Sequence, residues 1–188
     1  MRGREIHLEN LSDKERGYLF GLFEGDGYKV YDKKSRHYHV EFYLNSIKDK
    51  GIIKFMVNLL GNLGLKPNLY QDKRFNCMRV RVYSKFLFQE IKKNISFNNI
   101  NKDFGLGFVS GLIDSEGWVS KKKHTIRIIN TNKSILDSCK GFLDSLDISS
   151  SITQRKKSKK DKLDSYLMLV LVNFKRLNHL SIKAGKLQ

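Results

Sequence analysis

Polar and apolar residues alternate along two stretches of the first half of the chain, and this period of two predicts antiparallel strands. Over residues 37–44 the two faces would be His37, His39, Glu41 and Tyr43 against Tyr38, Val40, Phe42 and Leu44. Over residues 78–83, Arg79 and Arg81 alternate with apolar residues, and a turn near Asp72–Asn76 makes this stretch the second strand of a hairpin. Each strand would therefore bury one face and leave the other polar.

Other stretches have the spacing of helices. Residues 47–63 carry an apolar stripe at intervals of three and four, and Gly64 followed by Pro67 would end that helix. A short helix is expected near Lys85–Ile91. Ser12–Glu15 reads SDKE, the capping box in which a serine and a glutamate satisfy the first backbone N–H groups of a helix.

The second half repeats this order of elements. A helix ending at Gly117 would be followed by a strand over Thr125–Asn130, a helix through residues 135–146, a hairpin over residues 150–172 and a last helix near Phe174–Leu180. The sequence therefore predicts an α+β fold of two αββαββα halves. We expect the first half at residues 1–91, a linker at 92–102 and the second half at 103–188.

Two similar stretches begin the halves. They read GYLFGLFEGDG from Gly17 and GFVSGLIDSEG from Gly107, an offset of ninety residues. Small residues fall at every fourth position, at Gly17, Gly21 and Gly25 and then at Gly107, Gly111 and Ser115. Positions four apart share one face of a helix, so we expect the two helices to pack backbone to backbone. Gly27 and Gly117 would end them in the left-handed conformation.

The same stretches end in acids. If the helices pack side by side, Asp26 and Glu116 meet at their C-terminal ends, where the helix dipole is already negative. Two such carboxylates repel each other, and a divalent cation would relieve that repulsion. Asp26 and Glu116 are therefore candidate metal ligands. Glu24 and Asp114, two residues earlier, are expected to be structural or capping groups.

The net charge of the chain indicates which class of partner it binds. The 188 residues contain 36 Lys and Arg against 19 Asp and Glu, a formal net charge of +17. Such an excess favours a polyanionic partner. No apolar run reaches the roughly 18 residues that span a bilayer, and the expected helices lack a lysine-rich polar face for a membrane surface. We therefore expect a nucleic-acid partner and no membrane. Cys77 and Cys139 have neither metal-ligand nor disulfide spacing, as in an intracellular protein.

The two nine-residue cores, LFGLFEGDG at 19–27 and VSGLIDSEG at 109–117, resemble the motif of the LAGLIDADG homing endonucleases. That resemblance implies antiparallel sheets forming a DNA-binding saddle, with the two motif helices packed at the interface between the halves. It implies a monomer that makes a metal-dependent double-strand break in a long, non-palindromic DNA site. Asp26 and Glu116 would be catalytic and would hold two or three Mg²⁺ ions, which Mn²⁺ can replace. The resemblance also implies an intron-encoded protein of a prokaryotic cytoplasm or an organelle.

Further residues follow from this resemblance. Asn130 matches a polar catalytic residue that orders water near the metals. In the first half Asn45 and Lys48 remain alternatives for that role, and Lys92 and Lys121 are the candidates for a basic active-site residue. The polar strand faces and the basic hairpin tip, RKKSKKDK, would contact DNA through His37, His39, Tyr43, Arg79, Arg81, Thr125, Arg127, Thr153, Arg155, Lys156 and Lys157. The second strand of that hairpin departs from the pattern, because it is apolar on both faces.

Three alternatives remain. The resemblance also covers RNA maturases, for which intron RNA would be a partner, and DNA-binding regulators that do not cleave. Acids at both motif ends argue against a regulator with an inactive site. A basic ribosome-associated protein would explain the charge, but it would not explain the paired small-residue helices.

Overall fold

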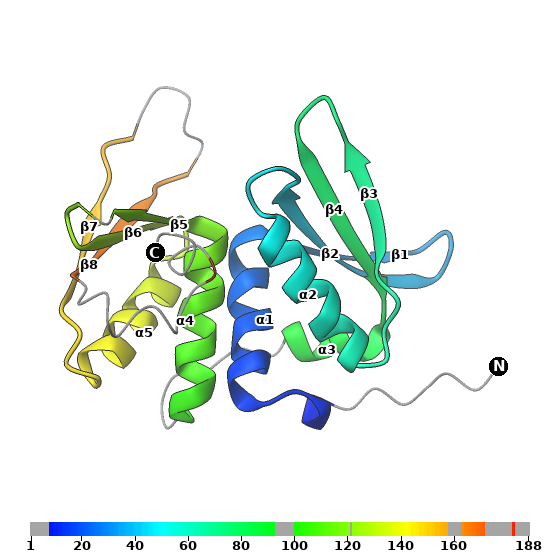
Figure 1. Ribbon diagram of the computed structural model, residues 1–188, viewed down its shortest axis with the longest axis horizontal. Helices are drawn as coiled ribbons and strands as arrows, with labels where there is room; N and C mark the ends of the chain where they lie inside the picture. Colours follow the sequence, from blue (N-terminus) through cyan, green and yellow to red (C-terminus); the bar gives the residue numbers. More distant parts are fainter. Residues whose placement is uncertain (1–7, 93–99, 121, 158–162, 172–181, 183–188) are drawn as a thin grey trace.

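Two parallel helices at the centre of the molecule join its two halves, as Figure 1 shows for the computed structural model. The structure describes residues 8–92, 100–120, 122–157, 163–171 and 182. The first half consists of α1 (Asp13–Asp26), β1 (Gly27–Asp32), β2 (His37–Asn45), α2 (Lys50–Asn62), β3 (Asn68–Asp72), β4 (Cys77–Tyr83) and α3 (Lys85–Lys92), after a 3₁₀ turn, η1 (Leu8–Asn10).

The second half follows the same order. It consists of α4 (Lys102–Glu116), β5 (Gly117–Ser120), β6 (Thr125–Asn130), α5 (Lys133–Asp144), β7 (Ser150–Gln154) and β8 (Tyr166–Leu171). The predicted α+β fold of two αββαββα-like halves is confirmed. The helix expected near Phe174–Leu180 lies outside the described residues, as do residues 93–99 of the expected linker.

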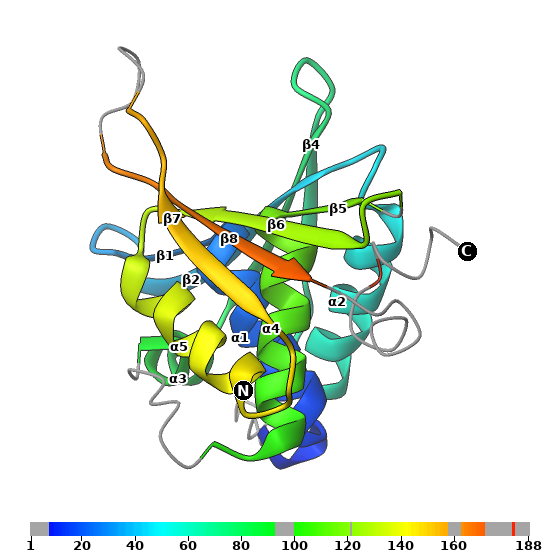
Figure 2. The same ribbon diagram turned by 90° about the vertical axis from the view of Figure 1, so that its left-hand side faces the viewer.

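Each half contains one four-stranded antiparallel sheet. The strand orders are β1-β2-β4-β3 and β5-β6-β8-β7, so β4 and β8 occupy equivalent central positions. One face of each sheet packs on the helices, with Val40 and Phe42 fully buried in the first half and Ile126 and Ile128 in the second. In Figure 2 the second sheet faces the viewer, with α5 below it. The opposite faces point away from the helical layer and are called here the outer faces.

The capping box predicted at Ser12 is present, with Glu15 N–H donating to the Ser12 hydroxyl and the Glu15 carboxylate accepting from Ser12 N–H. The expected end of α2 is also confirmed, since Gly64 has a φ of +75°. Asp147, eighty-three residues later, has a φ of +56° after α5. Both turns close with an N–H donating to the carbonyl five residues earlier, at 3.0 Å in each case.

The motif glycines lie where the two central helices touch. A Cβ on Gly17 would lie 2.0 Å from the Phe104 carbonyl oxygen, and one on Gly107 would lie 2.0 Å from the Lys14 carbonyl oxygen. These two contacts exchange when ninety is added to one residue number and subtracted from the other. The helices are thus related by a pseudo-twofold axis, and the predicted backbone-to-backbone packing is confirmed.

The prediction for Gly27 and Gly117 is wrong. Their φ/ψ angles are −91°/150° and −87°/147°, which is extended backbone rather than the left-handed conformation. Each residue is the first of a strand, so the chain passes from helix to strand without a turn. Glycine is needed there for space, because a Cβ on Gly27 would lie 2.3 Å from the Phe23 carbonyl oxygen and one on Gly117 would lie 2.4 Å from that of Ile113.

The close contact between α1 and α4 predicts how a substitution at Gly21 changes stability. A Cβ on Gly21 would lie 1.9 Å from the Phe108 carbonyl oxygen, so Gly21→Ala forces two backbones apart. We expect it to lower the free energy of unfolding by about 3 kcal/mol, the upper part of the range for overpacking. The control is Gly141→Ala in α5, whose Cβ would meet no atom within 4 Å and which should stabilise by about 0.5–1 kcal/mol. Denaturant unfolding measures both, and equal effects of the two variants would contradict the packing.

Candidate functional site

The ends of α1 and α4 bring the two motif acids to one place. A Cβ on Gly25 would lie 2.1 Å from the Ser115 hydroxyl oxygen and 2.8 Å from Cγ of Glu116. Asp26 follows Gly25 directly, and both Asp26 and Glu116 are half-buried and precede the first residue of a strand. The helix packing therefore brings the last turn of α1 into contact with Glu116 itself.

The two helix ends act against a negative charge on these acids. Neither helix has a basic residue in its last turn, and each helix contributes the negative end of its dipole. No group of three or more His, Cys, Asp or Glu side chains suited to a metal occurs among the described residues. A pair of carboxylates nevertheless fits Mg²⁺, which is commonly held by one or two carboxylates while water and substrate phosphates complete its octahedron.

Asp114 and Glu24 have environments of another kind. Asp114 is fully buried, and its Oδ2 accepts from the Tyr18 hydroxyl and from the Ile182 N–H, each at 2.9 Å. Burial, followed by the adjacent Asp114 carboxylate, raises the pKa of Tyr18 well above its ordinary value. Glu24 is half-buried, and burial raises the pKa of its carboxyl while Lys29 opposes that shift. The structural role expected for Asp114 is confirmed.

Asn130 lies beside the end of α4. Ile128 pairs with Gly117, so β6 continues two residues beyond the start of β5 and ends at Asn130. The Asn130 side chain is buried, and its Oδ1 accepts from Asn132 N–H at 2.7 Å. The sheet register matches Asn130 with Leu44, because Phe42 pairs with Gly27 in the first half.

The polar residues proposed for the first half remain unsettled. Asn45 lies one position past the register equivalent of Asn130, and its Oδ1 accepts from the N–H groups of Ile47 and Lys48 at 3.0 and 2.9 Å. Lys48 is exposed in the turn before α2. Lys121 and the side chain of Lys92 lie outside the described residues.

The outer face of the first sheet carries a polar network. Arg81 forms an ion pair with Glu41, which also accepts from the Tyr43 hydroxyl at 2.5 Å. The guanidinium groups of Arg79 and Arg81 lie 4.7 and 5.6 Å from the ring centre of Tyr70. Contrary to a simple alternation of exposed and buried residues, Glu41 is only 2% exposed, because its cross-strand neighbours cover it.

The two histidines on this face differ in exposure. His37 is exposed, whereas His39 is 7% exposed and packs edge-on against Tyr83 with ring centres 4.7 Å apart. The Nε2 atom of His39 is buried without a hydrogen-bond partner.

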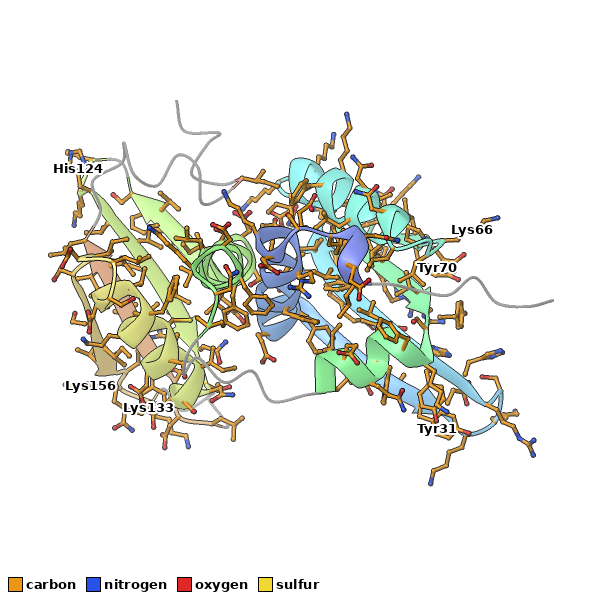
Figure 3. The ribbon with its side chains drawn as sticks, turned by 90° about the horizontal axis from the view of Figure 1, so that it is seen from below. Tyr31, Lys66, Tyr70, His124, Lys133 and Lys156 are labelled. Carbon is orange, nitrogen blue, oxygen red and sulfur yellow. The ribbon has the colours of Figure 1, made fainter. Side chains whose placement is uncertain are left out.

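The candidates of the second half are spread over its sheet and hairpin. Arg127 and Thr153 are exposed on the outer face, with the Arg127 guanidinium 5.3 Å from the ring centre of Trp118. Thr125 is only 8% exposed, and its hydroxyl is buried without a partner. Arg155, Lys156 and Lys157 are exposed on the hairpin, where Lys156 is labelled in Figure 3.

The β3–β4 hairpin forms a groove that the sequence did not reveal. Its volume is about 820 Å³. Aromatic and basic side chains dominate the lining, which includes Tyr43, Tyr70, Lys73, Arg74, Phe75 and Arg79. Phe75 at the hairpin tip is 72% exposed. Aromatic faces beside cations are typical of nucleic-acid sites, and only the pairing of β2, β3 and β4 brings these residues together.

Positive charge is concentrated in the layer of strands and turns. The five α-helices of the described residues contain nine basic and ten acidic residues. The segments 27–49, 63–84, 117–132 and 145–171, which hold every described strand, contain twenty basic and seven acidic residues. Most of these basic residues lie in the turns, so positive charge borders the outer faces of the sheets, where it would attract a polyanion. No described helix is both long and apolar enough to cross a membrane.

Comparison with known proteins gives one family. The model of the LAGLIDADG-like domain matches residues 13–96 and, a second time, residues 103–181. An uncharacterized protein of Methanocaldococcus jannaschii, MJ0314, is 29% identical over 159 residues, which cover 76% of this chain and 59% of that protein. This chain thus spans less than two thirds of the relative's length.

Solved structures show the same fold. A variant of the homing endonuclease I-DmoI, in complex with its target DNA and manganese, is similar with a TM-score of 0.70 and 22% identity, over 91% of this chain and 94% of that one. The N-terminal LAGLIDADG domain of DUF199/WhiA is similar with a TM-score of 0.64 and 17% identity, over 97% and 86% of the two chains. Identities this low establish the fold alone.

The raised pKa of Glu24 predicts how the stability of the fold depends on pH. The folded state holds the Glu24 proton more tightly than the unfolded chain, whose carboxyl titrates near 4.5. The stability that this group contributes is therefore present below that pH and is lost as the pH rises through the folded-state pKa. Glu24→Gln, which stays neutral, should raise the melting temperature at about pH 7.5 and leave it unchanged at about pH 4.

The exposed Glu9→Gln is the control for this experiment and should change the melting temperature little at either pH. Thermal unfolding followed by circular dichroism measures both variants. A Glu24→Gln protein that is less stable than the wild type at about pH 7.5 would show that the fold favours the ionised carboxylate instead.

Proposed function

Because the chain belongs to the LAGLIDADG-like domain family, we propose that it is a site-specific DNA endonuclease that breaks both strands of a long duplex site. The observation that carries this proposal is the contact between the last turn of α1 and Glu116, which places two acids at adjoining helix ends. Such an arrangement is unfavourable for stability. A divalent cation bound between these acids and the phosphates of a substrate would offset the unfavourable negative charge.

Asp26 and Glu116 would hold the metal ions in this proposal. When bound, Mg²⁺ would activate a water molecule and stabilise the leaving oxygen of the scissile phosphodiester. The I-DmoI structures with DNA include crystals with calcium, manganese and magnesium. Hydrolysis would form a bond from the water oxygen to phosphorus and break the P–O3′ bond, leaving a 3′ hydroxyl and a 5′ phosphate.

The remaining residues would bind and orient the duplex. Arg155, Lys156 and Lys157 on the exposed hairpin would contact phosphates, which gives affinity without sequence information. Arg79 projects from the outer face of the first sheet, where an arginine can read a guanine edge in the major groove. Asn130 beside the end of α4 would order water near the acids.

The site would lack two-fold symmetry. One chain supplies both halves, and their outer faces differ at most register-equivalent positions. A monomer of this kind would read two different half-sites, and a location inside the cell and an intron-encoded origin would follow from that role.

A DNA- or RNA-binding protein without cleavage is the second candidate. It is favoured by the fold similarity to the WhiA domain. Such a protein would bind a regulatory DNA site or would assist the splicing of intron RNA. It would not require the two acids at the helix ends.

Selection from a randomised plasmid library tests the proposal. The protein is incubated with the library and Mg²⁺, with Ca²⁺ in a parallel reaction, and the linearised molecules are sequenced. Specific double-strand breaks with Mg²⁺ would support the endonuclease. Retention of particular DNA or RNA sequences under both metals, with no break, would support the second candidate.

Substitution of Asp26 tests its proposed catalytic role on a DNA site that the protein cleaves. Asp26→Asn should lower the cleavage rate about a hundredfold or more, because removal of one metal-ligand charge weakens stabilisation of the transition state. DNA affinity in Ca²⁺ should change less than about threefold, because the sheets and hairpins supply the contacts. Asp137→Asn is the matched control, since Asp137 is exposed and pairs with Lys133 on α5. Unchanged cleavage by Asp26→Asn would remove Asp26 from the catalytic site.

A further inference from the structure

The two sheets present chemically different outer faces at equivalent positions. Counting from Gly27 and Gly117, the register aligns the outer residues of β4 with those of β8. The three outer positions of the central strand are Arg79, Arg81 and Tyr83 in the first sheet and Leu167, Leu169 and Leu171 in the second. Side chains that donate hydrogen bonds are thus replaced by leucines along the outer side of β8.

Apolar side chains also lie at some outer positions of the other strands, beside the polar residues Ser120, Thr125, Ser151 and Thr153. Trp118 and Leu171 are 55% and 54% exposed, and Ile129, which pairs with Leu167, is 37% exposed. Arg127 is the one charged residue among the outer positions of β5–β8. The outer side of β8 can therefore make no side-chain hydrogen bonds to base edges and offers methyl groups along its length, whereas hydrogen-bonding side chains lie on the strands around it.

The position of this face favours duplex DNA as its occupant. It is the pseudo-symmetric equivalent of the polar face of the first sheet, so a duplex that lies on one lies on the other. Basic residues flank it at the β5–β6 turn, with Lys122 and Lys123, and on the β7–β8 hairpin, with Lys156. In Figure 3 His124 of that turn and Lys156 lie at opposite edges of the second half. The apolar face is thus bordered by groups that attract phosphates.

The major groove of DNA contains one kind of apolar group, the C5-methyl of thymine. We propose that the β5–β8 sheet recognises its half-site through thymine methyl groups, with Leu167 and Leu169 as the specificity-determining residues. The half-site under this sheet is then rich in thymine, whereas the half-site under the β1–β4 sheet is read by hydrogen bonds. This inference rests on the proposed binding of duplex DNA, but it does not require cleavage.

Replacement of thymine by deoxyuridine tests the inference, because it removes the methyl and preserves the hydrogen-bonding groups of the base. The full chain is titrated in Ca²⁺ with its selected site, with deoxyuridine placed in one half-site at a time. Deoxyuridine under β5–β8 should weaken binding about fourfold for each contacted methyl. Deoxyuridine under β1–β4 should change the affinity less than about twofold.

Variants assign the effect to the two leucines. In the double variant Leu167→Ala, Leu169→Ala, the ratio of affinities for thymine and deoxyuridine should fall close to one. Arg79→Ala, at the position equivalent to Leu167, should weaken binding through the other half-site and leave that ratio as in the wild type. The substituted residues lie outside the hydrophobic core, so circular dichroism should show that each variant folds like the wild type.

The outcomes separate this inference from the proposed function. Equal binding of thymine and deoxyuridine under β5–β8, with specific binding or cleavage retained, overturns the inference alone. A face covered by a second copy of the chain would give that result together with a dimer in sedimentation that the leucine variants disrupt. Failure to bind any duplex overturns the inference and the proposed function together.

Discussion

The close contact between α1 and α4 is the constraint on which the rest of the structure depends. Side chains at Gly17, Gly21, Gly107 or Gly111 would overlap backbone atoms of the opposite helix, so the helices can meet at this distance only because those positions are glycine. The contact fixes the pseudo-twofold axis between the halves. Each helix then continues directly into a strand, and the position of each sheet relative to that axis follows from the helix that precedes it.

The symmetry of this interface is incomplete, and its departures have physical consequences. Tyr18 donates to the buried Asp114 across the interface, but the residues ninety positions away are Phe108, which has no hydroxyl, and Glu24, which is half-buried with a raised pKa. The outer faces have diverged further, since arginines in one half correspond to leucines in the other. The backbone arrangement is thus repeated more closely than the side-chain chemistry.

Much of the fold was predictable because its strongest signals are local in sequence. The capping box at Ser12, the strands β2 and β4 and the helix end at Gly64 each depend on a few neighbouring residues, and all were confirmed. The conformation of Gly27 and Gly117 was not predictable in this way. A glycine that ends a helix is usually left-handed, and the need for space beside the Phe23 and Ile113 carbonyls appears only in three dimensions.

The candidate site was less accessible to sequence reasoning. Alternation assigned Glu41 and His39 to a polar face, but only the pairing of β2 with β4 places Arg81 and Tyr83 beside them and buries both. The groove at the β3–β4 hairpin likewise combines residues of three strands. Sequence spacing was sufficient for Asp26 and Glu116 because the ninety-residue repeat aligns the two helix ends directly. Their metal binding and the DNA contacts remain predictions.

The central claim is that Asp26 and Glu116 are held together for a bound cation and at a cost in stability. The most direct test is the free energy of unfolding of the double variant Asp26→Asn, Glu116→Gln, measured by denaturant titration in EDTA. Loss of two charges from the negative ends of two helices, and of their mutual repulsion, predicts a gain of about 1–2 kcal/mol over the wild type. A double variant that is less stable than the wild type would contradict the claim, because the carboxylates would then stabilise the fold themselves.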